Sequence, residues 1–118
     1  MDPHSEAYMG LGYLYLKEGK NDLAEASFKD FIVKLRPKDD VYMGLGSLYM
    51  KERRYDEAID VYTKAAELKP DLGGYLELAR AYVAKSEYAA ARKALNRELA
   101  VHPDSVSAKE LMRQIANK

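Results

Sequence analysis

The sequence predicts an all-α protein built from three consecutive helix pairs and one final helix. Three observations carry this prediction. An apolar pattern that starts at Tyr8 recurs at a nearly constant period from Tyr42 and from Tyr75, the apolar spacing within each copy is helical, and a proline closes each copy. The chain is therefore expected to form a single repeat domain, 1–118, with repeats at approximately 5–38, 39–71 and 72–104 and a capping helix at 105–117.

The repeat is clearest in the stretch Tyr-Met-Gly-Leu-Gly, which occurs at 8–12 and again, unchanged, at 42–46. Six positions define the pattern in each copy. They are Tyr8, Leu11, Gly12, Tyr15, Ala24 and Phe28, then Tyr42, Leu45, Gly46, Tyr49, Ala58 and Tyr62, then Tyr75, Leu78, Ala79, Tyr82, Ala91 and Leu95. Three copies of a six-point pattern indicate one structural unit used three times.

Each copy contains two helices separated by a polar turn. The first helix has apolar residues at i, i+3 and i+7, and Asp2-Pro3 is typical of a helix start. Proline cannot continue a helix, so the prolines after the second helices mark their ends. These prolines are Pro37, Pro70 and Pro103. The expected helices are 3–18, 22–35, 39–52, 55–68, 72–85, 88–101 and 105–117, and the polar side of the last one suits a terminal cap.

This pattern resembles the tetratricopeptide repeat family over residues 5–118. The second copy, which ends in Ala65 and Pro70, is the closest match to the family spacing. The resemblance implies a right-handed α-solenoid of antiparallel helix pairs, seven helices in all, in which the first helix of each pair lines a concave groove. Phe31 and Glu98 stand where the family has a small residue, and Pro37 comes one residue late, which we expect to affect local packing only.

The glycines of the repeated stretch need an explanation, because glycine inside a helix costs about 1 kcal/mol relative to alanine. Gly12 and Gly46 correspond to Ala79, so we expect this position to need a small residue where the first helix approaches the second. Gly10 and Gly44 lie two residues earlier, about 200° around the helix. We therefore expect them to face the groove and to leave a shallow dent for a partner.

Family geometry implies a groove with an apolar centre, adaptable methionines and a rim that carries both signs of charge. The side chains expected to bind a partner are Met9, Gly10, Tyr13, Met43, Gly44, Ser47, Leu76, Glu77 and Arg80. The leading hypothesis is a protein-interaction module or adaptor that holds an apolar or amphipathic peptide or helix of another protein.

Some tetratricopeptide domains bind the C-terminal Glu-Glu-Val-Asp of heat-shock chaperones through a two-carboxylate clamp of lysine, asparagine and arginine side chains. The corresponding positions here are Met9, Tyr13, Gly44, Gly73 and Glu77. None of them has the clamp residue, and the carboxylate of Glu77 would repel the ligand. We therefore expect no such clamp.

Composition argues against several other classes of function. Nineteen basic residues balance nineteen acidic ones, so there is no electrostatic footprint for nucleic acid or for an anionic membrane. Cysteine is absent, His4 and His102 are far apart, and no phosphate-binding loop or metal motif occurs, so we expect no enzyme activity, cofactor or metal site. With no signal peptide and no membrane span, we expect the chain in the cytoplasm.

Two alternatives stay open. One is a structural or self-assembling scaffold, although the polar final helix favours a monomer. The other is an engineered scaffold without a dedicated ligand, which the identical pentapeptides fit but the unequal repeat lengths do not. The sequence identifies neither the partner nor whether the three repeats belong to a longer array.

Overall fold

The computed structural model describes the backbone of residues 3–35 and 40–118 and the side chains of residues 10–30 and 41–118. Asp2 and Pro37, and the side chains of Met9 and Phe31, lie outside these ranges. The described residues form α1 (Pro3–Lys17), α2 (Asn21–Leu35), α3 (Asp40–Lys51), α4 (Tyr55–Leu68), the 3-10 helix η1 (Pro70–Leu72), α5 (Gly74–Ala84), α6 (Tyr88–Val101) and α7 (Val106–Gln114). The seven expected helices are confirmed, and these ranges contain no strand.

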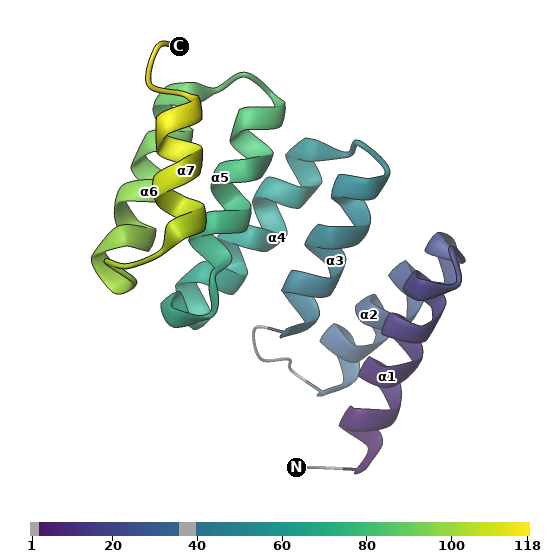
Figure 1. Ribbon diagram of the computed structural model, residues 1–118. Coiled ribbons are helices and arrows are strands. Elements are labelled where there is room, and N and C mark those ends of the chain that lie inside the picture. Colours follow the sequence, from purple (N-terminus) through teal and green to yellow (C-terminus); the bar gives the residue numbers. More distant parts are fainter. Residues whose placement is uncertain (1–2, 36–39) are drawn as a thin grey trace.

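The helices form an all-α solenoid in which pairs follow one another along the long axis (Figure 1). The molecule measures 45 × 27 × 20 Å, with α1 and α2 at one end and α6 and α7 at the other. Within a pair the helices pack against each other, and successive pairs meet where α2 contacts α3 and α4 contacts α5. The second helix of each of these repeats therefore belongs to two interfaces at once.

The turn inside each pair has the same backbone conformation in all three repeats. The residue that reverses the chain has a positive φ each time, at Gly19 (77°), Arg53 (60°) and Ser86 (61°). A backbone N–H then donates to a tyrosine carbonyl five residues earlier: Lys20 to Tyr15, Arg54 to Tyr49 and Glu87 to Tyr82. This satisfies carbonyls that the end of the first helix leaves without a partner, and it fixes the angle at which the second helix starts.

Aromatic rings fill the junctions between helices. The ring of Phe28 on α2 is fully buried and lies over two glycines. A Cβ at Gly12 would come within 2.7 Å of Phe28 Cε1, and one at Gly44 within 2.7 Å of Phe28 Cζ. Gly12 belongs to the same repeat as Phe28 and Gly44 to the next, so one ring sets the approach of α2 to both α1 and α3.

The same arrangement recurs with different sizes in the later repeats. A Cβ at Gly46 would overlap the ring of Tyr62, which is 1% exposed. In the third repeat Ala79 and Leu95, both fully buried, take these two places. The residue on the first helix is therefore glycine where the second helix has an aromatic ring, and alanine where the second helix has leucine. This confirms that the position on the first helix needs a small residue.

The expected open dent at Gly44 is wrong. Gly44 is buried against Phe28, and its Cβ position is also 3.1 Å from the hydroxyl oxygen of Tyr13. As expected from the helical rotation between positions 44 and 46, Gly44 points away from α4. However, α3 also packs against α2 of the preceding repeat, and Gly44 faces α2. Gly10 differs, because a Cβ there would meet no atom within 4 Å.

Glu98 stands at a position where the family pattern has a small residue. Its side chain on α6 is 3% exposed, and its Oε1 atom is buried without a hydrogen-bond partner. The corresponding residue of the second repeat, Ala65, fills this place without a polar group. We expect this oxygen to lower the stability of the fold, because a buried acceptor without a hydrogen bond keeps its desolvation cost.

We expect Gly46→Ala to lower the free energy of unfolding by about 1–3 kcal/mol, since overpacking against Tyr62 outweighs the better helix propensity of alanine. The double variant Gly46→Ala/Tyr62→Leu recreates the pair Ala79–Leu95 and should be more stable than the sum of the single changes predicts. Urea denaturation of the four proteins measures this coupling. Strict additivity would contradict the proposed contact.

Candidate functional site

The predicted groove residues lie on the first helices α1, α3 and α5. Six of them are at least partly exposed, and we call these six the groove surface. They are Tyr13, Met43, Ser47, Leu76, Glu77 and Arg80. Of the other three, Gly44 is buried, Gly10 is exposed, and the side chain of Met9 lies outside the described residues.

At the N-terminal part of this surface, Tyr13 covers Phe28. The two rings meet edge to face, with centroids 5.1 Å apart and planes at 75°. The hydroxyl of Tyr13 reaches over to Gly44 on the next first helix. Tyr13 is 40% exposed, so part of its side chain lies at the surface. The floor here is aromatic where the sequence predicted a dent.

In the middle of the surface, polar groups surround the edge of Tyr62. Burial raises the pKa of the Tyr62 hydroxyl, a hydrogen bond with Ser47 opposes this, and the nearby charge of Glu77 raises it further. Glu77 accepts a hydrogen bond from Arg80, with 2.8 Å between Arg80 Nη1 and Glu77 Oε1. Because the two charges are paired, this region presents hydrogen-bonding groups without a net charge.

At the C-terminal part, α7 adds residues that sequence reasoning had assigned only to a cap. A hollow of about 310 Å³ lies between α5 and α7. Its lining residues are Arg80, Val106, Ser107, Glu110, Leu111 and Gln114. The sequence carries a signal for the contribution of α7. Ala108 and Ile115 lie one repeat length after Gly74 and Ala81, and all four residues are buried. Helix α7 thus packs as the first helix of a further repeat.

An ion-pair network links α2 with α3 and with the turn that follows α3, and so holds the first two repeats together. Glu25 accepts hydrogen bonds from Tyr49 Oη at 2.9 Å and from Arg54 Nη1 at 3.2 Å, and Lys29 Nζ lies 2.8 Å from its Oε2. The guanidinium of Arg54 also lies over the Tyr49 ring, 4.4 Å from its centroid. Burial alone would raise the pKa of Glu25, but the hydrogen bonds from Lys29, Arg54 and Tyr49 outweigh it and lower the pKa to about 2.

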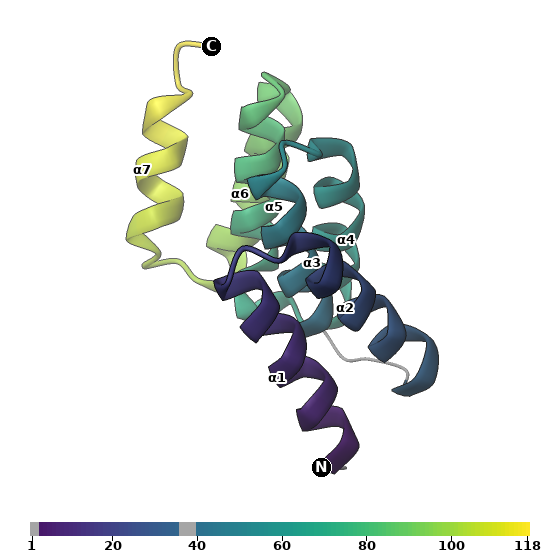
Figure 2. The same cartoon turned by 90° about the vertical axis from the view of Figure 1, so that its right-hand side faces the viewer.

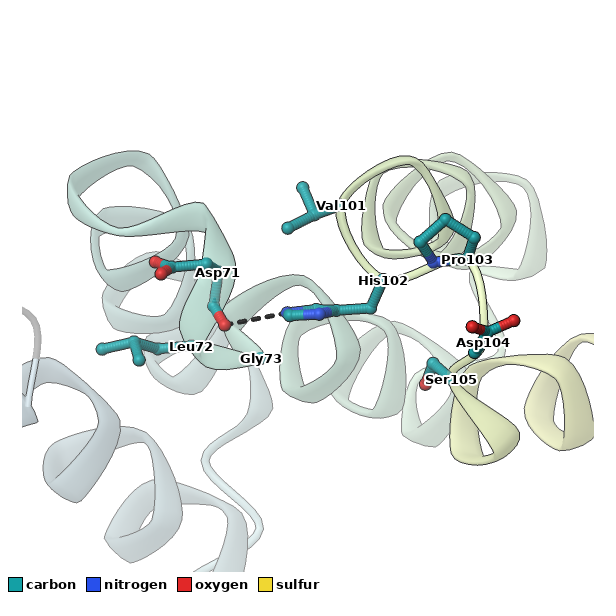
Figure 3. A pocket seen from close by; sticks show the side chains of 8 residues that line it. All are labelled: Asp71, Leu72, Gly73, Val101, His102, Pro103, Asp104 and Ser105. Carbon is teal, nitrogen blue, oxygen red and sulfur yellow. Dashed lines mark hydrogen bonds between the residues drawn. The ribbon is translucent and has the colours of Figure 1, made fainter.

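Another hollow, of about 700 Å³, lies between η1 and the loop after α6 (Figure 3). Its lining residues are Asp71, Leu72, Gly73, Val101, His102, Pro103, Asp104 and Ser105. The imidazole Nε2 of His102 lies 2.8 Å from the carbonyl oxygen of Asp71. His102 therefore links the ends of two consecutive repeats, which gives this histidine a structural role.

The described part of the chain contains no group of three or more His, Asp or Glu side chains that could hold a metal ion. Among the helices described, none is long and apolar enough to cross a membrane. What the surface of α1, α3, α5 and α7 offers is a row of aromatic, methionine and paired charged side chains.

Comparison with protein families decides the classification. Two models described as tetratricopeptide repeat match the chain, over residues 9–72 and 49–115. The chain belongs to the tetratricopeptide repeat family. This confirms the resemblance inferred from the repeated pattern. A comparison with curated protein sequences gives no match.

Solved tetratricopeptide structures share the fold at low sequence identity. One is the first such domain of Spaghetti (RPAP3) bound to the HSP90 peptide SRMEEVD, with TM-score 0.84, 20% identity, and coverage of 95% of this chain and 92% of that one. For the Arabidopsis OM64 TPR domain the TM-score is 0.85 at 18% identity, and the match covers 95% of this chain and 93% of that one. For the TPR2B domain of yeast Sti1, in a complex with pHsp70, the TM-score is 0.82 at 22% identity, and the match covers 95% of each chain.

The pKa of Glu25 makes stability depend on pH. Its folded-state pKa, about 2, is below the ordinary value of 4.5, so its contribution is present above that ordinary value and is lost as the pH falls toward 2. We expect Glu25→Gln to lower the free energy of unfolding by about 1–2 kcal/mol at neutral pH and by progressively less in acid. Denaturation at a series of pH values measures this difference.

Glu110→Gln is the matched control. Glu110 pairs with Arg113 on its own helix, and its side chain is 49% exposed, so the change should have little effect at any pH. A Glu25→Gln difference that stays constant from neutral pH down to the folded-state pKa of Glu25 would contradict the network.

Proposed function

We propose that this tetratricopeptide domain is an adaptor that holds an apolar or amphipathic segment of a partner protein along the groove surface. Tetratricopeptide domains are protein-interaction modules and are generally non-catalytic. The observation that supports this site is the row of partly exposed side chains on the successive first helices α1, α3 and α5, together with the hollow between α5 and α7. We infer that the domain acts as a monomer without enzyme activity.

The chemistry of this row favours an apolar ligand with few charges. Met43 and Leu76 are partly exposed in its middle and give adaptable apolar contacts. Tyr13 offers an aromatic ring at one end, and the hollow beside Leu111 accepts a side chain at the other. The charges of Glu77 and Arg80 neutralise each other, so they suit the polar edge of an amphipathic helix better than a strongly charged peptide.

The same geometry argues against the chaperone clamp, although two of the similar structures hold chaperone ligands. Tyr13 packs on Phe28, Gly44 is buried, and Glu77 adds a carboxylate where the ligand would bring its own. Gly73 carries no charge. A C-terminal Asp would therefore meet no free cation at these described clamp positions.

The groove is tested with peptides selected on the wild-type domain from a displayed random library. We expect Met43→Asp to weaken the selected peptides at least about tenfold, because it places a charge in the apolar centre. Leu68→Asp, at a 53% exposed leucine near the end of α4, is the control and should bind as the wild type does. Equal binding by the Met43→Asp protein would refute the groove assignment.

The same titration includes a peptide that ends in Glu-Glu-Val-Asp. We expect no saturable binding at concentrations of about 1 mM or below, since the clamp cations are missing. Micromolar binding of this peptide would overturn the proposed ligand class while leaving the location of the groove intact.

A further inference from the structure

Helix α1 presents an apolar face at the end of the solenoid. The other helices lie on one side of α1 in Figure 1, and α1 lies in front of them in Figure 2. Leu11 is 40% exposed and Leu14 is 51% exposed. A Cβ at Gly10, one helical turn before Leu14, would meet no atom within 4 Å. These three residues form a leucine-lined dent that no described helix covers.

The same face is covered on α3. Its counterparts in the second repeat are identical in residue type: Gly44, Leu45 and Leu48. There the glycine is buried, Leu45 is 2% exposed and Leu48 is 0% exposed. The other first helices do not repeat this face, because Glu77 and Leu111 stand in place of the glycine on α5 and α7. Only α3, among the described helices, therefore serves as a template for α1.

The occupant of the α3 face is α2, which uses two side chains three residues apart. The ring of Phe28 lies on Gly44, and the carboxylate of Glu25 binds Tyr49 and Arg54. The two contacts act together, since one fills the apolar dent and the other fixes the helix along its axis. This face of α3 therefore binds a helix with the pattern Glu-x-x-Phe.

The charged half of the contact is also present at α1. Tyr15 and Lys20 correspond to Tyr49 and Arg54. Lys20 Nζ lies 3.5 Å from Glu18 Oε2, which corresponds to the 3.0 Å pair between Arg54 and Glu52. A tyrosine and a basic residue therefore occupy the same positions of the repeat after Gly10 as they do after Gly44.

A second copy of this chain cannot supply the matching helix without unfolding its own. The pair Glu25 and Phe28 of α2 is already bound to α3. At the corresponding positions α4 has Ile59 with Tyr62, and α6 has Arg92 with Leu95, so neither offers the acidic residue.

We propose that Gly10, Leu11, Leu14, Tyr15 and Lys20 form a second docking surface, the α1 end face, for an amphipathic helix of a partner protein. That helix carries a glutamate three residues before a phenylalanine. Phenylalanine fills the dent at Gly10, and glutamate binds Tyr15 and Lys20. This surface shares only Gly10 with the residues expected in the groove, and it does not depend on the groove having the proposed ligand.

A synthetic peptide with the sequence of residues 20–36, which contains Glu25 and Phe28, is the probe. Titrated into the isotope-labelled chain, it should shift the amide signals of Gly10, Leu11 and Leu14 and leave those of Leu76 and Arg80 in place. A peptide that carries Phe28→Ala should bind at least about tenfold more weakly than the unchanged peptide. A peptide that carries Glu25→Gln should bind severalfold more weakly. Binding at the groove instead would shift the Leu76 and Arg80 signals and would overturn the proposal.

Variants of the chain provide the controls. Leu14→Lys and Gly10→Leu should abolish peptide binding, while circular dichroism shows an unchanged fold, because both positions are open to solvent. Leu68→Lys changes a leucine that is 53% exposed at the end of α4, which contributes nothing to this face, and should bind normally.

Three outcomes would overturn the proposal. The first is no binding at about 1 mM peptide. The second is a change in the Gly44 and Phe28 signals, which would mean that the peptide displaces α2. The third is concentration-dependent dimerisation of the wild type that Leu14→Lys abolishes, which would assign the face to a second copy.

Discussion

The contact of an aromatic ring with helix glycines sets the spacing of this solenoid. Phe28 lies on Gly12 of its own repeat and on Gly44 of the next, so a single side chain fixes the position of α2 against two helices. Backbones can approach this closely only where no Cβ intervenes, and the ring then fills the remaining space. Helix propensity lost at the glycines is offset by burial of the rings.

This spacing also determines what the groove surface can be. Phe28 lies against Gly12 and Gly44, and Tyr62 lies against Gly46. Three residues of the groove surface adjoin these rings, because Tyr13 packs on Phe28 and Ser47 and Glu77 lie near Tyr62. The exposed apolar groups are methionine, leucine and tyrosine, and the charges are paired across one helical turn. These are the groups that the proposed apolar ligand would contact.

Much of the fold could be predicted from the sequence, because the repeat period and the helical spacing are local properties. The seven helices and the need for a small residue at Gly12 and Gly46 followed from comparing the copies. The role of Gly44 did not, since it depends on how one repeat packs on the preceding one, and residues 28 and 44 are connected only through that packing. The contribution of α7 to the hollow was missed for a similar reason, because it depends on how this helix lies beside α5. The ion pairs were also beyond prediction, because exposed charges of both signs are common in this sequence and no pairing for Glu25 could be chosen.

Gly10 and Gly44 differ in role because the ring of Phe28 lies on Gly44, whereas a Cβ at Gly10 would meet no atom within 4 Å. Comparing the free energies of unfolding of Gly10→Ala and Gly44→Ala, which change the same residue in the same pentapeptide, tests this most directly. Gly10→Ala should raise stability by up to about 1 kcal/mol through helix propensity, and Gly44→Ala should lower it by about 1–3 kcal/mol through its clash with Phe28. Equal stabilisation by both changes would contradict the account.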